Sequence, residues 1–295
     1  MNKKTIQFIV NPFSGWSSKE GLRDDINREL DHDLFDYVYT ETESKGHAIQ
    51  LAKEAVDRNT DIVVACGGDG TVNEVAQSLV DTQSILGILP GGSGNGFAMH
   101  IGWGRNIKKA LRKLGQAETK VIDSCTVNNK FFLNLAGVGF DALIAYKADS
   151  GTKRGLQMYL GMISKEMLKF KAEKFHVKID DETIEGNFTT IAVANAAMYG
   201  YNFTIAPSAD LTDGFLDIVF VHEAPLLRTI SSSWRMLNNS LDKSALVSIK
   251  RSKEVTITAE NPYYFHLDGE SFTFEKDLHF KINPKSIKVL FPQSN

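Results

Sequence analysis

The 295-residue sequence is poor in cysteine, with Cys66 and Cys125 as its only two. They are far apart and neither is part of a CxxC pair, which excludes a disulfide framework and argues against a structural zinc site. No apolar run approaches the roughly 20 residues of a bilayer-spanning helix, and the run at 6–10 is too short for a signal peptide. We therefore expect a soluble, cytoplasmic protein without a transmembrane segment.

The sequence also lacks an excess of positive charge, since its formal net charge is -3. Nucleic-acid-binding domains usually carry a clustered basic surface, so no nucleic-acid partner is expected. Hydrophobic residues make up 42% of the chain and charged residues 23%, which is an ordinary globular balance. The length is sufficient for two domains.

The first third of the sequence alternates short apolar strands with amphipathic helices. Strands are predicted at 6–10, 35–39, 61–66 and 85–89, and helices at 19–30, from Gly46 and from Val72. Continuously apolar strands such as 61–66 are typical of parallel strands that are covered on both faces. This order predicts a parallel α/β domain.

After about residue 120, strand patterns dominate. Strands are predicted at 131–135, 189–194, 216–221, 255–258, 278–282 and 287–291, with helices at 153–172 and 225–240. Leu278, Phe280 and Ile282 alternate with polar residues, as in a half-exposed antiparallel strand. We place the domain boundary near residue 125, giving domains 1–125 and 126–295, with the last strands as candidates to return to the first domain.

One glycine-rich segment, GGDGTVNEV at 67–75, joins a buried strand directly to a helix. Thr71 and Glu74 match a capping box, which predicts a helix N-terminus at that point. Glycines beside such an N-terminus are suited to phosphate groups. Asp69 would then bind Mg²⁺ or accept a proton. Alone, the segment could also be a simple strand-to-helix turn.

Two further loops support the phosphate interpretation: NPFSG at 11–15 and PGGSGNGF at 90–97 each follow a predicted parallel strand. The carboxyl ends of parallel strands meet at one edge of the sheet, where open α/β sheets bind ligands. Neither a GxxxxGK[ST] motif nor a GxGxxG spacing in the 67–75 loop is present, so Walker A and Rossmann sites are excluded.

These loops resemble, in order, the motifs of the diacylglycerol kinase catalytic domain family, which includes sphingosine and ceramide kinases. The resemblance extends to TESKGHA at 42–48, NLAGVGFDA at 134–142, IAPSADLTDGFLDI at 205–218 and HLDGE at 266–270. It implies an α/β nucleotide-binding domain like that of NAD kinases and phosphofructokinases, followed by an antiparallel β-sandwich. It further implies transfer of the γ-phosphate of ATP, with Mg²⁺, to a lipid hydroxyl.

Carried over to this sequence, the resemblance implies a set of nucleotide-contacting residues: Asn11, Pro12, Phe13, Ser14, Gly15, Thr42, Gly67, Gly68, Asp69, Gly70, Thr71, Asn73, Glu74, Ser93, Gly94 and Asn95. The candidates for the proton acceptor are Asp69, Asp268 and Glu270. Asp268-Gly269 could equally be a hairpin turn.

The same resemblance implies a Mg²⁺ ion held by Asp210, Asp213 and the backbone carbonyl of Phe215, in a segment that also reads as a turn. Asp141 is a candidate contact for the lipid headgroup. Many bacterial diacylglycerol kinases have aspartate after the asparagine of the third loop, whereas this chain has Gly96. The lipid is therefore left open between diacylglycerol and a sphingosine- or ceramide-type substrate.

The segment from residue 153 to 174 mixes basic residues with leucines and methionines. Such a stretch can lie on an anionic membrane surface, or it can simply cover the domain. We expect a peripheral enzyme that meets its lipid at the membrane, with a homodimer as a possible assembly. The alternatives are a soluble-substrate kinase such as an NAD kinase, and a nucleotide-binding regulator without turnover.

Overall fold

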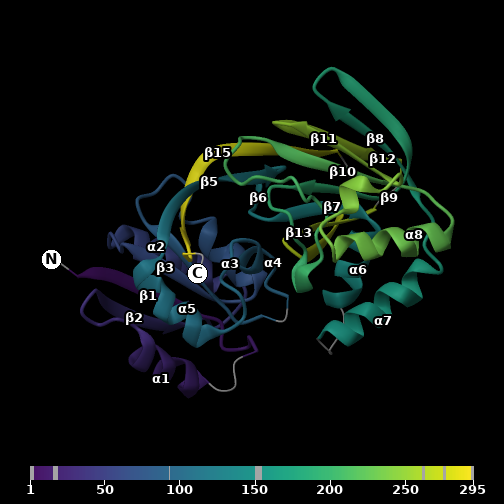
Figure 1. The fold of residues 1–295 in the computed structure, drawn as a ribbon. Coiled ribbons are helices and arrows are strands. Elements are labelled where there is room, and N and C mark those ends of the chain that lie inside the picture. Colours follow the sequence, from purple (N-terminus) through teal and green to yellow (C-terminus); the bar gives the residue numbers. More distant parts are fainter. Residues whose placement is uncertain are drawn as a thin grey trace. The chain divides into compact units, whose positions relative to one another are not determined.

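The computed structural model describes residues 3–15, 19–92, 94–149, 155–260, 263–274 and 277–293 (Figure 1). The chain forms two compact units, of which the first comprises residues 1–122 and 285–295 and the second residues 123–284. Each unit is described separately below.

Unit 1 is a parallel α/β layer. Its elements are β1 (Lys4–Val10), α1 (Lys19–Glu29), β2 (Phe35–Glu41), α2 (His47–Asp57), β3 (Ile62–Gly67), α3 (Asp69–Ala76), β4 (Ile85–Pro90), α4 (Gly96–His100) and α5 (Ile107–Lys113). The strand order is β4-β3-β1-β2, all parallel, and the end of β15 (Leu278–Phe291) adds a further parallel strand beside β4. The predicted parallel α/β domain is confirmed.

The direction of the crossovers reverses in the middle of this sheet. From β1 the chain moves outward to β2, whereas from β3 it moves the other way to β4. Helix α1 packs against α5, and α2 against α3, as expected when right-handed crossovers cover both faces. The switch point therefore lies between the carboxyl ends of β1 and β3, which is where such sheets bind ligands.

Unit 2 is an antiparallel, sandwich-like β domain, as predicted. Its strands are β5 (Glu118–Val127, shared with unit 1), β6 (Lys130–Phe132), β7 (Leu135–Gly139), β8 (Glu173–Ile179), β9 (Glu182–Ala194), β10 (Leu216–His222), β11 (Val247–Ser252), β12 (Glu254–Ala259), β13 (Tyr263–Leu267), β14 (Glu270–Phe274) and most of β15. Its helices are α6 (Phe140–Asp149), α7 (Leu156–Met167) and α8 (Leu226–Ser233).

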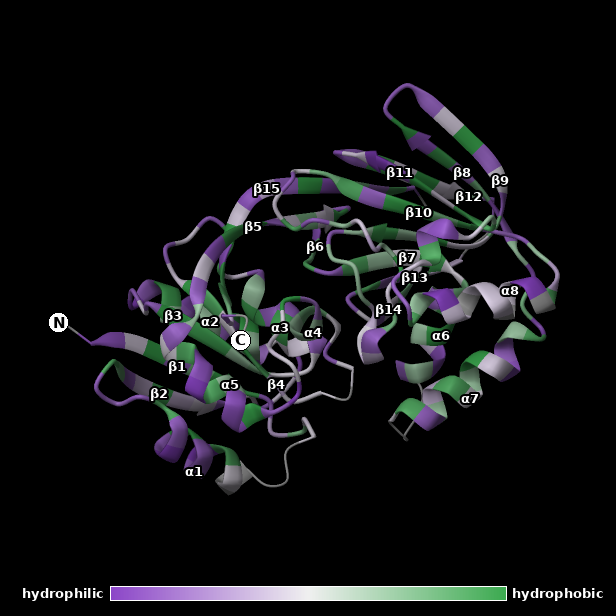
Figure 2. Cartoon of the chain, in the orientation of Figure 1, coloured by the Kyte–Doolittle hydropathy of each residue, from purple (hydrophilic) through white to green (hydrophobic). Residues whose placement is uncertain are grey.

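The long strand β9 connects two parts of the unit 2 sheet. Residues 182–188 pair with β8, whereas residues 190–194 lie between β7 and β10. Phenylalanines from six strands fill the core that results: Phe132, Phe175, Phe188, Phe220, Phe265 and Phe280. In Figure 2 the hydrophobic residues alternate with hydrophilic ones along several of these strands, as half-buried strands require.

Some predicted boundaries change in the structure. The strand expected at 131–135 is interrupted by a bend at residues 133–134, between β6 and β7. The strands expected at 278–282 and 287–291 are one strand, β15, whose residues 278–282 alternate between buried and exposed as predicted. The helix expected at 225–240 ends at Ser233 and is followed by a 3₁₀ turn, η3 (Trp234–Met236). Residues 153 and 154 of the other expected helix lie outside the described part of the chain.

A core substitution in unit 2 tests this packing. The ring of Phe280 is buried and meets that of Phe132 edge to face, with centroids 6.2 Å apart. Phe280→Ala should lower the free energy of unfolding by about 3–5 kcal/mol, because it removes a large buried side chain and leaves a cavity. Urea denaturation measures this change.

Phe13→Ala is the matched control, since the Phe13 side chain is exposed. It should change the free energy of unfolding by less than about 0.5 kcal/mol. Equal effects of the two substitutions would contradict the core described here.

Candidate functional site in the glycine loops and the carboxylate turn

The glycine-bearing loops of unit 1 lie at the carboxyl edge of its sheet. The loop at 11–15 follows β1, the turn at 67–69 ends β3, and the loop at 91–95 follows β4. These strands are neighbours in the order β4-β3-β1, so the loops meet at the switch point of the sheet.

Hydrogen bonds fix the loops to one another. The Asn11 amide N–H donates to Cys66 O (2.9 Å), and the Asn11 side-chain Nδ2 donates to Thr71 Oγ1 (3.2 Å). The Gly15 N–H donates to Gly91 O (2.7 Å). The three segments that the sequence suggested as one phosphate site are therefore brought together.

Two glycines allow the second and third loops to touch. A Cβ atom on Gly92 would lie 2.6 Å from Gly68 Cα and 3.0 Å from Asn95 Oδ1. The first of these neighbours is backbone, which cannot rotate away, so any side chain at residue 92 forces the loops apart. Asn95 fixes the third loop from within, because its Oδ1 accepts the Gly92 N–H (2.9 Å).

The carboxylate of Asp69 links the same two loops. Its Oδ2 accepts the Gly96 N–H (3.0 Å) and its Oδ1 accepts the Phe97 N–H (3.2 Å), at the start of α4. Both oxygens thus bind backbone amides, and hydrogen bonds from N–H groups to a carboxylate are among the stronger ones in proteins. In this structure Asp69 determines the position of the third loop relative to the second.

The predicted capping box is wrong. Helix α3 begins at Asp69 with Gly68 as its N-cap, and neither Thr71 nor Glu74 makes a side-chain cap bond to it. Glu74 Oε1 instead accepts the Gly46 N–H (2.9 Å), in the segment that precedes α2. Glu74 therefore attaches a fourth segment, residues 42–46, to the edge of the sheet.

The remaining nucleotide candidates lie on these same segments. Thr42 is buried and its N–H donates to Val10 O (2.8 Å), which continues the pairing of β1 and β2. The Phe13 side chain is exposed, and its N–H donates to Asn11 Oδ1. Ser93 lies outside the described residues. The other candidates occupy the loops, the end of β3 or the first two turns of α3: Pro12, Ser14, Gly67, Gly70, Asn73 and Gly94.

In unit 2, Asp268 and Gly269 form the two-residue turn between β13 and β14. Both have positive φ, 47° and 90°, and Leu267 pairs with Glu270 across the turn, as in a type I′ hairpin. The Asp268 carboxylate accepts three amide N–H groups of the bend between β6 and β7, those of Leu133, Asn134 and Leu135, at 2.9–3.0 Å. The turn prediction therefore holds, and the carboxylate also orders a second segment.

Asp141, the candidate headgroup contact, lies at the start of α6 in a polar cluster. Its Oδ2 accepts the Tyr199 hydroxyl (2.7 Å) and lies 3.0 Å from His266 Nε2. The cluster depends on Gly137, because a Cβ there would lie 2.4 Å from Asp141 Oδ2 and 3.1 Å from His266 Nε2. His266 is buried, and its Nδ1 has no partner among the described residues.

The candidate Mg²⁺ ligands are brought into one turn before β10 but do not form an open oxygen cage. Asp210 Oδ1 accepts the N–H and the hydroxyl of Thr212, and Asp213 Oδ1 accepts the Phe215 N–H (2.9 Å). The other oxygen of Asp213 pairs with the Arg251 guanidinium. A cation of this chain therefore occupies the place that the resemblance assigned to the metal, and the residues as arranged do not fit Mg²⁺.

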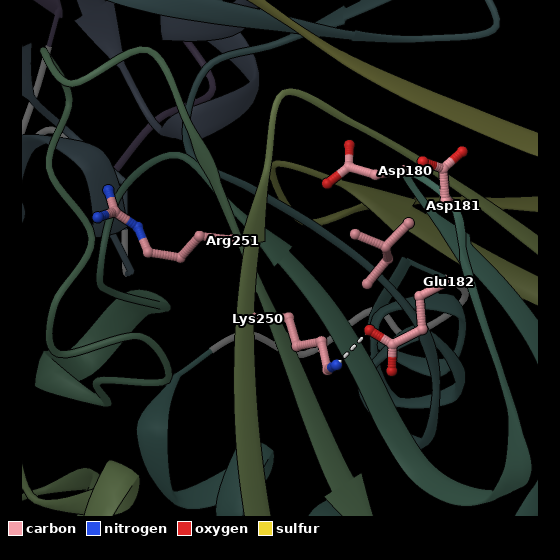
Figure 3. Close-up of a pocket in the computed structure, with 6 residues that line it drawn as sticks. Asp180, Asp181, Glu182, Lys250 and Arg251 are labelled. Carbon is pink, nitrogen blue, oxygen red and sulfur yellow. Dashed lines mark hydrogen bonds and ion pairs between the residues drawn. The ribbon is translucent and has the colours of Figure 1, made fainter.

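Arg251 can reach Asp213 because consecutive side chains of a strand point to opposite faces of the sheet, so Arg251 and Lys250 are directed to different sides. Lys250 and Arg251 are consecutive on β11 and line a shallow open pocket of about 640 Å³ together with Asp180, Asp181 and Glu182. Figure 3 shows Lys250 directed toward Glu182 and Arg251 directed away from that pair. The Lys250 Nζ and Glu182 Oε2 atoms form an ion pair at 2.5 Å. The guanidinium also lies over the Phe215 ring, 5.3 Å from its centroid. This pocket contains none of the predicted site residues.

Some site residues were not found from the sequence. Asp123 is fully buried, and its Oδ2 accepts the Gly214 N–H (2.7 Å), so it supports the turn that contains Asp213. Asn195 Nδ2 donates to Leu133 O (2.7 Å) beside the segment that Asp268 holds. Several missed residues lay within recognised motifs, among them Gly92 in PGGSGNGF, Gly137 in NLAGVGFDA and His266 in HLDGE, and these motifs offered a signal for them.

The comparisons with known proteins divide the chain at nearly the same point as the structure does. Residues 5–127 match the model of the diacylglycerol kinase catalytic domain, and residues 134–291 match that of the YegS C-terminal NAD kinase beta sandwich-like domain. Together these models cover both units. The chain belongs to the diacylglycerol kinase family of lipid kinases.

Individual relatives are moderately similar over nearly their full length. The diacylglycerol kinase of Bacillus subtilis is 27% identical, with 90% of each chain covered. That of Staphylococcus saprophyticus is 26% identical, over 91% of this chain and 89% of the relative. A crystal structure of a diacylglycerol kinase from Bacillus anthracis superposes with a TM-score of 0.75 at 19% identity, over 99% of this chain and 98% of the other, and supports the fold. Among the described residues, none of the helices has the length and apolarity to span a bilayer.

The Arg251–Asp213 pair makes a prediction about Mg²⁺. Without nucleotide, Mg²⁺ should leave the thermal unfolding midpoint of the wild type unchanged, because Arg251 already pairs with the Asp213 carboxylate. Arg251→Ala should make that midpoint rise with Mg²⁺ by a few degrees, since ligand binding to the folded state stabilises it. Differential scanning calorimetry measures both.

The double variant with Asp213→Asn is the control and should lose this response. A Mg²⁺-dependent rise in the wild type that Asp213→Asn abolishes would show that the metal does bind this turn.

The cluster around Asp141 makes a prediction about pH. Burial, with a contribution from the Asp141 charge, raises the pKa of Tyr159 to about 12 and raises the pKa of Tyr199 well above its usual range. Unfolded tyrosine ionises near pH ~10, so the unfolded chain loses these protons first. The stability that the protonated phenols provide is fully present below about pH 10 and is lost as the pH rises toward about 12.

Asp141→Asn should lower both pKa values, because it removes a negative charge beside each phenol. Tyrosine NMR resonances followed during an alkaline titration report them individually. Burial, with Asp277, raises the pKa of Tyr263, so Tyr263 should not respond and serves as the internal control. Unchanged titration of Tyr159 and Tyr199 would contradict the cluster.

Proposed function

We propose that this lipid kinase transfers the γ-phosphate of ATP to the hydroxyl of diacylglycerol and forms phosphatidic acid. The observation that carries the proposal is the edge of unit 1, where four loop segments are hydrogen-bonded around the switch point of the sheet. Membership of the diacylglycerol kinase family supports the reaction class. Relatives named diacylglycerol kinase support the choice of lipid.

The nucleotide site is proposed at this edge. Phosphoryl transfer depends mainly on positioning and on offsetting the phosphate charge. The backbone of residues 67–71 and 91–96 is the proposed phosphate cradle, because the glycines permit close approach and the first N–H groups of α3 have no partner within the helix. Asn11 and Thr42 are proposed to line the nucleotide, and the exposed ring of Phe13 offers an apolar surface for its base.

Mg²⁺ is proposed to enter with ATP, as part of the substrate, and to offset the charge of the phosphates there. The loop before β10 is not proposed as its site, since Arg251 occupies Asp213. The role of unit 1 in the mechanism is then to hold the phosphates through its amides. Asp69 maintains this cradle by fixing Gly96 and Phe97 relative to α3.

The acceptor hydroxyl also needs a proton acceptor, and we assign that role to Glu270. Asp69 already accepts two backbone N–H groups and Asp268 accepts three, so both act first as positioning residues. Glu270 is half-buried and begins β14 directly after the Asp268-Gly269 turn. The hydroxyl oxygen forms a bond to the γ-phosphorus, the bond from that phosphorus to the ADP oxygen breaks, and the hydroxyl proton passes to Glu270.

A lipid panel with radiolabelled ATP tests the function directly. Diacylglycerol, sphingosine and ceramide are presented separately in mixed vesicles, and NAD is presented in solution. Label should appear in phosphatidic acid. Labelling of sphingosine or ceramide instead would contradict the proposed lipid, and labelling of NAD alone, or none at all, would contradict a lipid kinase.

Three variants assign the roles within that assay. Gly92→Ala should abolish ATP binding, because its Cβ collides with Gly68, while Gly161→Ala should not, since nothing lies within 4 Å of a Cβ there. Glu270→Gln should lower kcat by about 10²–10⁴-fold while the protein stays folded. Asp268→Asn should also destabilise the fold by about 1–3 kcal/mol, because an amide group would face backbone donors. Full activity of Glu270→Gln would remove Glu270 from the mechanism.

A further inference from the structure

Strand β14 begins with Glu270, the proposed proton acceptor, and lies at an edge of the unit 2 sheet. In the described part of the chain, β14 pairs with β13 and has no second neighbouring strand. An edge strand leaves the N–H and C=O groups of one side without partners in the ladder. The sheet therefore constrains the position of β14 less than that of a central strand.

One of these edge amides belongs to Ser271, the residue after Glu270. Leu267 and Glu270 flank the two-residue turn and form the hydrogen-bonded pair beside it. Because hydrogen-bonded and non-hydrogen-bonded pairs alternate in an antiparallel ladder, the next pair, His266 and Ser271, is non-hydrogen-bonded. The Ser271 N–H is thus directed away from β13, and its partner must come from outside the hairpin.

Asp149, the last residue of helix α6, is that partner. Its Oδ2 accepts both the Ser271 N–H (2.9 Å) and the Ser271 hydroxyl (2.6 Å). Hydrogen bonds to an ionised carboxylate are shorter and stronger than those between neutral groups. Asp149 therefore holds β14 at the residue next to Glu270.

The other end of α6 contacts the opposite member of the same cross-strand pair. Asp141, in the first turn of α6, lies 3.0 Å from Nε2 of His266, which is directly opposite Ser271. Between the two carboxylates, the Tyr146 ring stacks on that of Tyr264 in β13, with centroids 4.1 Å apart. Helix α6 thus packs against both strands of the hairpin and contacts it at both of its ends (Figure 2).

Helix α6 is also fixed by contacts outside the hairpin. It follows β7 directly, and Gly139 at the junction lies so close to β9 that a Cβ there would be 2.6 Å from Thr189 O. Near its C-terminal end, Lys147 pairs with Glu166 of α7 at 2.6 Å. The helix can therefore act as a support against which the edge strand is held.

We propose that Asp149 is a positioning residue for phosphoryl transfer, which acts through Ser271 to fix the strand that carries Glu270. The inference rests on the proposed function, because it takes Glu270 as the acceptor of the hydroxyl proton. Proton transfer requires this carboxylate within hydrogen-bonding distance of the hydroxyl. A displacement of about 1 Å can lower a rate by roughly 100-fold. An exposed contact with little effect on stability can therefore have a large effect on kcat.

Steady-state kinetics on a short-chain diacylglycerol, dissolved as monomers, test this role. Asp149→Ala should lower kcat by roughly tenfold or more. The KM for ATP should not change, because the proposed nucleotide site lies in unit 1. Asp149→Asn should retain most of the activity, since an amide oxygen can accept the same two hydrogen bonds. Wild-type kcat in Asp149→Ala, or equal losses in the two variants, would overturn the proposal.

Asp61→Ala is the matched control. Asp61 is exposed, as Asp149 is, and its Oδ2 accepts the N–H and the hydroxyl of Thr5 at 2.7 and 2.9 Å. It precedes β3, at the edge of the unit 1 sheet opposite the glycine loops. Both alanine variants should shift the thermal unfolding midpoint by a similar small amount, but only Asp149→Ala should lower kcat. Equal losses of kcat would mean a general effect of destabilisation and would contradict the proposal.

Ser271→Ala completes a double-mutant cycle with Asp149→Ala. Alone it should lower kcat less than Asp149→Ala does, because the Ser271 N–H remains. If Asp149 acts through Ser271, adding Ser271→Ala to Asp149→Ala should lower kcat no further. Additive losses would show that Asp149 acts by another route and would overturn the proposal.

Hydrogen–deuterium exchange tests the contact without turnover. Asp149→Ala should speed exchange in the peptides that cover residues 267–274, and exchange at 179–182 should stay unchanged. Unchanged exchange at 267–274 would overturn the positioning role. If the wild type phosphorylates no lipid, the proposed function is wrong, and the exchange result still decides whether Asp149 holds β14. Full activity of Glu270→Gln would overturn this inference together with the assignment of Glu270.

Discussion

The hydrogen bonds from Gly96 and Phe97 to the Asp69 carboxylate are the interaction on which the proposed nucleotide site depends. Glycine loops offer a ligand their amides but have few side chains to hold their shape. Here one carboxylate at the start of α3 fixes the start of α4, and Gly92 allows the two loops to touch. An aspartate within the proposed phosphate-binding segment therefore has a structural explanation before any catalytic one is needed.

The second unit has a similar arrangement, because an aspartate of its HLDGE motif also accepts backbone N–H groups of a neighbouring segment. Asp268 forms a hairpin turn with Gly269 and also binds three amides of the bend at 133–135, so one residue joins two strand connections. Two of the three carboxylates suggested as proton acceptors are thus held by backbone donors. We therefore treat Asp69 and Asp268 first as positioning residues, and Glu270 is our proposed acceptor of the hydroxyl proton.

Features encoded by local sequence could be predicted, whereas long-range partners could not. Apolar strands followed by glycines identified the parallel sheet and the loops at its edge, and Asp268-Gly269 identified a hairpin turn. The capping box failed because Thr71 lies within the helix and Glu74 finds its partner 28 residues away, at Gly46. Asp213 pairs with Arg251, 38 positions away, and Asp141 pairs with His266, 125 positions away. Strand register brings these residues together, and no local sequence pattern encodes it.

Hydrogen–deuterium exchange of the whole protein, with and without ATP, tests the central claim most directly. If the four segments at the edge of unit 1 form the nucleotide site, ATP should slow exchange in the peptides that cover residues 11–15, 42–46, 67–71 and 91–97. Peptides from the hairpin at 179–182, beside the pocket of Figure 3, should exchange at the same rate in both states. Protection confined to other parts of the chain, or none in these four segments at saturating ATP, would contradict the account.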